Sequence, residues 1–142
     1  VIMTHFALRD MAQRGVGRVI MVGSYSDIAP PPTQSAYSVS KGSLRLLTRS
    51  LVADISDRMP NIIFNDWMPG RLAGETGVED GIALERAAVW GVNLAGHTSE
   101  GLNGVEFAGA REKRMSKSLK RRIVDKIKGR KGRPLVSLED SG

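Results

Sequence analysis

A regular alternation of helical segments with short apolar strands constrains the fold more than any other feature of this chain. Residues 18–22 are a β-branched apolar run, as in a strand buried on both faces of a parallel sheet. The expected order is helix, strand, helix, strand, helix, strand, over residues 1–15, 18–22, 34–56, 61–68, 82–95 and 104–107. Right-handed crossovers would turn this order into a parallel sheet with helices on both faces. We therefore predict an α/β fold with a doubly wound sheet.

Two strand ends point to the position of a site. Ser24 follows the strand at 18–22, and Pro69-Gly70 follows the strand at 61–68. In parallel sheets of this kind, ligands bind beyond the carboxyl ends of the strands. We expect both segments to meet at that edge.

Tyr37 and Lys41 follow a proline-rich loop and begin the helix at 34–56. A spacing of four residues places both side chains on one helix face. An ammonium beside a phenol favours the phenolate and lowers a pKa that is ordinarily about 10, so such a tyrosine can exchange a proton near neutral pH. Ser24, thirteen positions before Tyr37, could hold a substrate oxygen where charge develops. The alternative is a surface tyrosine with a lysine packed across it.

Together these motifs resemble the short-chain dehydrogenase/reductase family. The resemblance rests on GRVIMVGS at residues 17–24, on Tyr37-Ser-Val-Ser-Lys41, and on Asn65 followed by Pro69-Gly70. It spans about residues 11–107. It implies a Rossmann-type sheet, NAD or NADP as cofactor, and hydride transfer between an alcohol and a carbonyl on a small-molecule substrate. It also implies a homo-oligomer, a dimer or a tetramer. The absence of cysteine fits a cytoplasmic protein.

The resemblance also implies catalytic roles. Tyr37 would be the general acid/base, Lys41 would assist it and hold the ribose hydroxyls of the cofactor, and Ser24 would orient the substrate. Tyr25 and Asp27, which lie beside this serine, could touch the substrate.

Further residues would bind the cofactor. In the family, the backbone just after Pro69-Gly70 meets the nicotinamide amide, which makes Leu72 the candidate. A threonine usually follows shortly afterwards, and Thr76 is the nearest one here, although it comes later than in the usual pattern.

The family's glycine-rich phosphate-binding turn is missing from these 142 residues. Gly15-Val16-Gly17 precedes a strand, whereas the fingerprint must follow one. The first helix also has no capping residue before it. We therefore expect residues 1–110 to be the C-terminal part of such a domain, with half of the cofactor site.

The charge is concentrated near the end of the chain. Residues 111–133 contain twelve Lys or Arg against two acidic residues, a balance of +10, while nine basic and thirteen acidic residues elsewhere leave −4. Apolar residues at steps of four predict a basic amphipathic helix there. It could bind nucleic acid or an anionic membrane. The favoured alternative is that its apolar stripe packs on the body of the protein or on a partner subunit, with its charges solvated. Residues 134–142 would form an acidic flexible tail.

Other classes are disfavoured. The chain contains no cysteine, its two histidines lie far apart, and no run reaches the roughly 18 apolar residues of a membrane span. No metal site is expected. The competing function is a non-catalytic binding protein of the same fold that uses its basic helix. Nothing in the sequence identifies the substrate or the preferred dinucleotide.

Overall fold

The computed structural model describes residues 2–74, 79–98, 101–113 and 133–139. Its elements are α1 (Ile2–Arg14), β1 (Gly17–Val22), the 3-10 turn η1 (Tyr25–Asp27), α2 (Ser35–Ile55), β2 (Ile62–Met68), α3 (Leu84–Gly96), β3 (Val105–Ala108) and β4 (Arg111–Lys113). The order predicted from the sequence is confirmed as far as β3. Strand β4 was not predicted.

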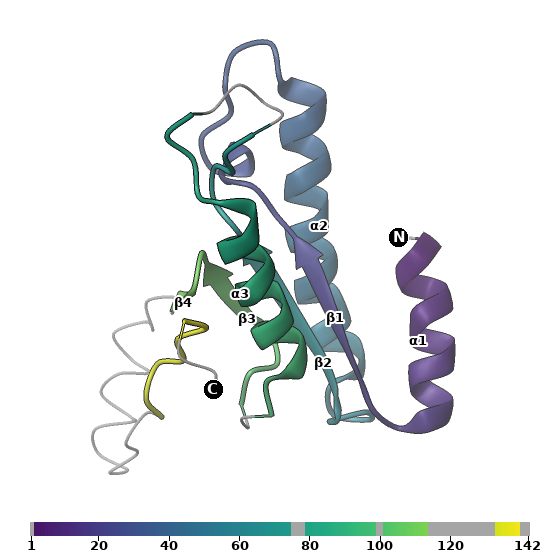
Figure 1. The fold of residues 1–142 in the computed structure, drawn as a ribbon. Helices are drawn as coiled ribbons and strands as arrows, with labels where there is room; N and C mark the ends of the chain where they lie inside the picture. The colour runs from purple at the N-terminus through teal and green to yellow at the C-terminus, as the bar shows by residue number, and fades with distance from the viewer. Residues whose placement is uncertain (1, 75–78, 99–100, 114–132, 140–142) are drawn as a thin grey trace, which may run out of the picture.

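The four strands form one sheet in the order β1-β2-β3-β4. Strands β1, β2 and β3 are parallel, and β4 runs antiparallel to β3. Helices α2 and α3 cover opposite faces of this sheet (Figure 1). The predicted α/β class, with a largely parallel sheet between helices, is confirmed.

Neighbouring residues of β2 show which helix covers which face. The Thr48 hydroxyl of α2 donates to Asp66 Oδ1 at 2.6 Å, while a side chain at Gly91 of α3 would touch the Trp67 ring. Successive strand residues point to opposite faces, so α2 and α3 lie on opposite sides of β2.

The two crossovers have opposite hands. From β1 to β2 to β3 the chain moves in one direction across the sheet, yet its two connecting helices lie on different faces. The β1-α2-β2 unit is right-handed and the β2-α3-β3 unit is left-handed (Figure 1). The expectation of right-handed crossovers throughout, which holds for most such units, is wrong for the second one.

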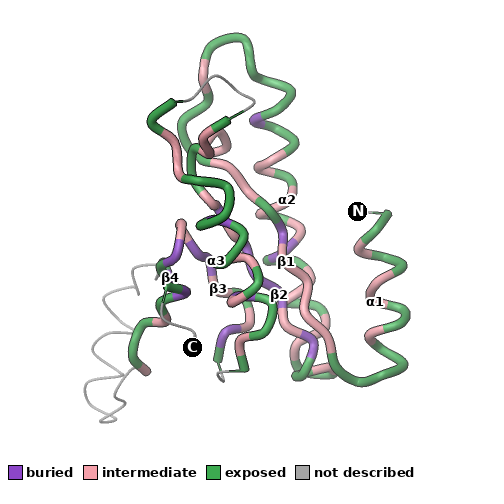
Figure 2. Tube along the Cα trace, in the orientation of Figure 1, coloured by how far each residue is buried: buried purple, intermediate pink, exposed green. Residues whose placement is uncertain are grey.

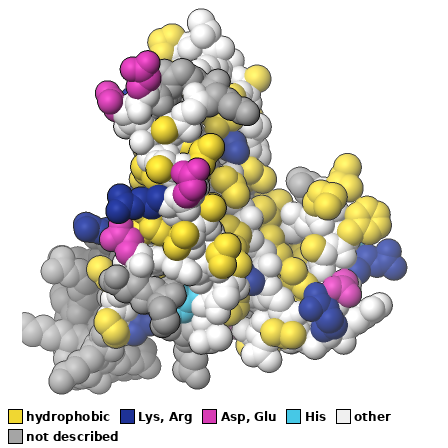
Figure 3. Space-filling model, viewed as in Figure 1, with side chains coloured by type: hydrophobic (Ala, Val, Ile, Leu, Met, Phe, Trp, Pro, Cys, Tyr) yellow, Lys and Arg dark blue, Asp and Glu magenta, His cyan; other side chains and the backbone are white. Residues whose placement is uncertain are grey.

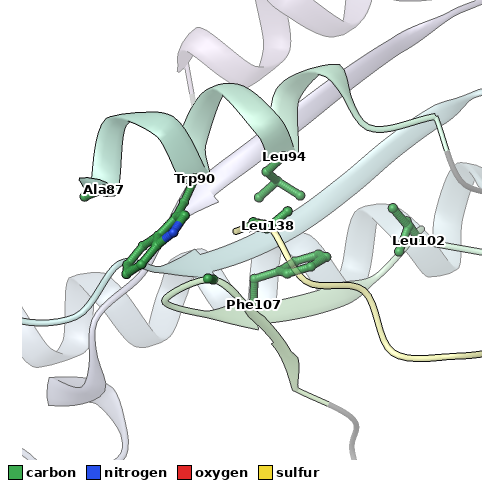
Figure 4. Close-up of a cluster of buried hydrophobic side chains, with 7 residues drawn as sticks. Ala87, Trp90, Leu94, Leu102, Phe107 and Leu138 are labelled. Carbon is green, nitrogen blue, oxygen red and sulfur yellow. The ribbon is translucent and has the colours of Figure 1, made fainter. Parts of the chain in front are cut away.

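The main apolar cluster lies between α3 and the sheet. Figure 4 shows Trp90 and Leu94 of α3 facing Phe107 of β3, with Leu102 and Leu138 beside them. The apolar spacing within residues 82–95 predicts an inward face made of Ala83, Ala87, Trp90 and Leu94. Ala87, Trp90 and Leu94 are buried as predicted, whereas Ala83 precedes the helix and is exposed.

The C-terminal segment differs from expectation. Arg111–Lys113 form strand β4 rather than the start of a basic helix, and residues 114–132 lie outside the described residues. The expected flexible tail is also wrong for residues 134–139. Leu138 is fully buried, and its N–H donates to the Ala110 carbonyl at 2.7 Å. The segment is fixed in place because Leu138 packs within the apolar cluster.

Helix α1 stands beside β1 and contains no buried residue, as its mostly exposed path in Figure 2 shows. Figure 3 shows hydrophobic side chains gathered on α1. Ile2, Met3 and Phe6 are all exposed. Gly15 ends the helix with a φ of 72°, a conformation that glycine adopts without strain.

No helix in the described ranges is long and apolar enough to cross a membrane. The structure therefore provides no helical membrane span over these residues.

Asp66 makes stability depend on pH. Burial beneath α2 raises the pKa of its carboxyl above 3.8, against the opposing effects of the Thr48 hydroxyl and of Arg45. The folded state thus holds this proton at pH values where the unfolded chain has released it, so stability falls as pH rises from about 3.8 through the folded-state pKa. We expect Asp66→Asn, which can still accept from Thr48, to raise the free energy of unfolding at neutral pH. Urea unfolding across pH checks this. A gain that persisted unchanged into acid would contradict it.

Candidate active site

A cleft of about 440 Å³ lies at the carboxyl ends of β1 and β2. It is lined by residues that follow each strand and by two residues of α2. The predicted site residues in its lining are Ser24, Tyr25, Tyr37, Lys41, Pro69, Gly70 and Leu72. The structure therefore brings together residues as distant in sequence as 24 and 72.

Tyr37 and Lys41 face the cleft from successive turns of α2. The Lys41 ammonium lies 5.5 Å from the centroid of the Tyr37 ring and donates to the Val22 carbonyl at 3.0 Å. The second contact fixes the ammonium at the end of β1. Tyr37 is 46% exposed, so its phenol is accessible from the cleft.

Ser24 lies where β1 passes into η1. It caps this turn, because its hydroxyl accepts from the Ser26 N–H at 3.2 Å. The hydroxyls of Ser24 and Ser26 lie 3.1 Å apart, and both residues line the cleft. The two serines therefore form one hydroxyl pair, a contact that the thirteen-residue step to Tyr37 does not reveal.

The backbone at Leu72 has a distinctive orientation. Leu72 pairs with Ile82 in a parallel bridge, in which Ala73 N–H donates to Ile82 O at 2.9 Å and Ile82 N–H donates to Arg71 O at 2.8 Å. In a parallel ladder the residue between two such bonds points its own N–H and carbonyl the other way. Those of Leu72 are therefore directed away from Ile82.

One predicted residue does not line the cleft, and another lies outside the described residues. Both carboxylate oxygens of Asp27 accept from the Arg45 guanidinium, and Asp27 does not line the cleft. The prediction that Asp27 touches the substrate is therefore not supported by its position, because the half-buried Arg45 binds its carboxylate. Thr76 lies outside the described residues.

Sequence reasoning missed Arg71 and Arg45. Arg71 lines the cleft, and its place directly after Pro69-Gly70 was an available signal. Arg45 lies among the leucines that form the half-buried stripe of α2, and no local pattern shows that it faces a buried carboxylate. Among the described side chains, no group of three or more His, Cys, Asp or Glu could hold a metal ion.

Gly81 keeps the loop before α3 close to the cleft wall. A Cβ at this position would collide with backbone atoms of Leu72 and Ala73. We expect Gly81→Ala to lower the free energy of unfolding by about 1–3 kcal/mol, since the backbone must shift to make room. Gly96→Ala is the matched control, because a Cβ there meets nothing within 4 Å. Equal urea midpoints for the two variants would contradict the prediction.

The family model for short chain dehydrogenases matches residues 1–85. The chain belongs to this family. The matched part of the chain includes both strands that end at the cleft and the whole of α2.

Curated relatives agree with this family. Dehydrogenase/reductase SDR family member 4 from Homo sapiens and from Pongo abelii are each 38% identical to this chain over 69 residues, and the Sus scrofa protein is 37% identical over 70. Each match covers 49% of this chain and 24% of the relative. The aligned region is thus about a quarter of the length of these relatives.

Solved structures share the fold of this chain. Acetoin dehydrogenase from Enterobacter cloacae aligns with a TM-score of 0.64 at 23% identity, over 74% of this chain and 46% of that one. An NADPH-bound carbonyl reductase from chicken fatty liver aligns with a TM-score of 0.53 at 19% identity, over 72% and 45%. At these identities the likeness concerns the fold alone.

Proposed function

We infer that this chain carries the proton-transfer part of an NAD(P)(H)-dependent oxidoreductase that interconverts a small alcohol and its carbonyl. The observation that carries the inference is the convergence of Ser24, Tyr37 and Lys41 on one cleft at the carboxyl edge of the sheet. Membership of the short chain dehydrogenase family supports the reaction class.

The cleft offers groups that fit a nicotinamide cofactor, which supplies or accepts the hydride when bound. The Lys41 ammonium has three donors. One is given to Val22 O, so the others are suited to the ribose hydroxyls. The N–H and carbonyl of Leu72 are directed away from Ile82 and would pair with the carboxamide.

Tyr37 would exchange the proton. Its phenol donates to the substrate oxygen during reduction and accepts that proton during oxidation, as a general acid/base does. The Lys41 charge, 5.5 Å from the ring centroid, stabilises the negative charge that the phenol oxygen acquires. Ser24 would donate a hydrogen bond to the same substrate oxygen and hold it within reach of Tyr37.

The inference predicts that NADH or NADPH binds at this cleft and that Lys41→Ala weakens the binding about tenfold or more, through loss of charged hydrogen bonds. Fluorescence titration measures the affinity, on this chain and on the longest polypeptide that contains it. Arg58→Ala is the control, since Arg58 lies near the other end of α2, where it donates to Asp54 O.

Titrating both nucleotides also determines which one is preferred. The proposed function would be contradicted if neither nucleotide bound to this chain or to the longer polypeptide. It would direct attention to a non-catalytic role for this fold.

A further inference from the structure

A second charged cluster lies behind the cleft, between α2 and the sheet. Arg45 of α2 is at its centre. Its guanidinium donates to Asp27 Oδ2 at 2.5 Å and Oδ1 at 3.2 Å, and to Glu106 Oε2 at 2.5 Å. One side chain thus joins η1, α2 and β3.

The members of this cluster are withdrawn from solvent. The side chains of Arg45, Asp27 and Glu106 are 17%, 6% and 10% exposed. By contrast, the Asp10–Arg14 pair on α1 is 65% and 56% exposed. Exposed pairs contribute little, whereas buried, bidentate arginine–carboxylate contacts are strong and geometrically specific.

The cluster connects the two parts of the candidate active site. Asp27 ends the turn that Ser24 caps, and Arg45 lies one helical turn beyond Lys41, two turns beyond Tyr37. The Asp27 side chain lies against α2 at Gly42, where an added Cβ would be 3.7 Å from Asp27 Cβ. Moving η1 relative to α2 would therefore move Ser24 relative to Tyr37.

A second contact extends the same cluster to the cleft. Glu106 Oε1 pairs with Lys113 at 3.0 Å, and that ammonium lies 5.8 Å from the centroid of the Tyr25 ring. Tyr25 follows Ser24 and lines the cleft. Both ends of η1 thus contact a basic side chain that pairs with Glu106: Tyr25 lies near Lys113, and Asp27 binds Arg45.

We propose that Arg45 is a positioning residue, which fixes η1 on α2 and so sets the separation of Ser24 from Tyr37. This role rests on the proposed function of the cleft. Arg45 does not itself line the cleft, and the one lining residue to which it is hydrogen-bonded is Met68, whose Sδ lies 3.3 Å from Nη2. Arg45 acts through Asp27, which explains why a carboxylate beside Ser24 is turned away from the cleft.

Asp27→Asn tests the role of Arg45 by weakening one of its contacts while leaving Glu106 as its partner. Amide hydrogen exchange is measured at Ile28 and Ala29, whose N–H groups donate to Tyr25 O at 3.0 and 2.9 Å. We expect exchange there to become about tenfold faster, with β2 unchanged. Asp10→Asn, the same substitution in the exposed pair, is the control and should alter neither region.

Arg45→Lys keeps the charge but loses the bidentate fork, and it should give the same local effect. In turnover assays, both Asp27→Asn and Arg45→Lys should lower kcat about tenfold to a hundredfold and leave the KM for the nucleotide unchanged, as misplacement of a reacting group does.

Unchanged exchange at Ile28 and Ala29 would overturn the proposal, as would faster exchange spread equally over β2. If the wild-type protein is active, the proposal would also be overturned by variants that exchange faster at Ile28 and Ala29 but keep the wild-type kcat. If the wild-type protein lacks turnover, the proposed function fails by itself, and the exchange result still decides whether Arg45 fixes η1.

Discussion

Tyr37→Phe is expected to lower kcat for carbonyl reduction by about 10²–10⁴-fold, the contribution typical of a positioned general acid. The variant loses one hydroxyl, and its aromatic ring remains beside the Lys41 ammonium. Nucleotide affinity should therefore stay close to that of the wild type. Steady-state turnover and a parallel fluorescence titration measure the two effects separately.

Tyr25→Phe is the matched control for this prediction. Tyr25 lines the same cleft, is 47% exposed and belongs to η1 rather than α2. Its substitution should cost much less turnover than Tyr37→Phe. Equal losses of kcat in the two variants would show that both phenols affect turnover only through the shape of the cleft. That result would contradict the role of Tyr37 as general acid/base.

Leu138→Ala is expected to lower the free energy of unfolding by about 2–5 kcal/mol, because it opens a cavity in a filled apolar cluster. Leu138 is fully buried among Trp90, Leu94 and Phe107. The segment is held at the same place by Asn93, whose Nδ2 donates to the Leu138 carbonyl at 2.7 Å. Urea unfolding measures the loss.

Leu135→Ala provides the control from the same segment, since Leu135 is 60% exposed. It should change the free energy of unfolding by less than about 0.5 kcal/mol. Similar values for the two leucines would mean that the C-terminal segment contributes little to the core.

The helices, the strands as far as β3 and most of the cleft residues were predictable because their signals are local. Period and composition separate the strand at 18–22 from the helix that follows, and four-residue spacing places Tyr37 and Lys41 together. Ligands bind at the carboxyl edge of such sheets, so Ser24 and Pro69-Gly70, which each follow a strand, are predicted to lie at one site. Each step needs only neighbours in sequence and one rule of topology.

The remaining features depend on contacts between distant residues. Leu138 belongs to a short segment that follows a basic stretch, and no local pattern indicates that it packs against Phe107. Arg45 looks like a solvated helix charge until β3 brings Glu106 beside it. The left-handed crossover departs from the general preference for right-handed units, so pattern alone predicted the wrong hand.

Isotope transfer tests the central claim most directly. The protein is incubated with a panel of carbonyl compounds and with NADH or NADPH that carries deuterium at the transferable position, and the products are analysed by mass spectrometry. The account predicts an alcohol with one deuterium on the former carbonyl carbon, formed by the wild type and strongly reduced in Tyr37→Phe. Label transfer that Tyr37→Phe leaves undiminished, or none with either nucleotide, would contradict it.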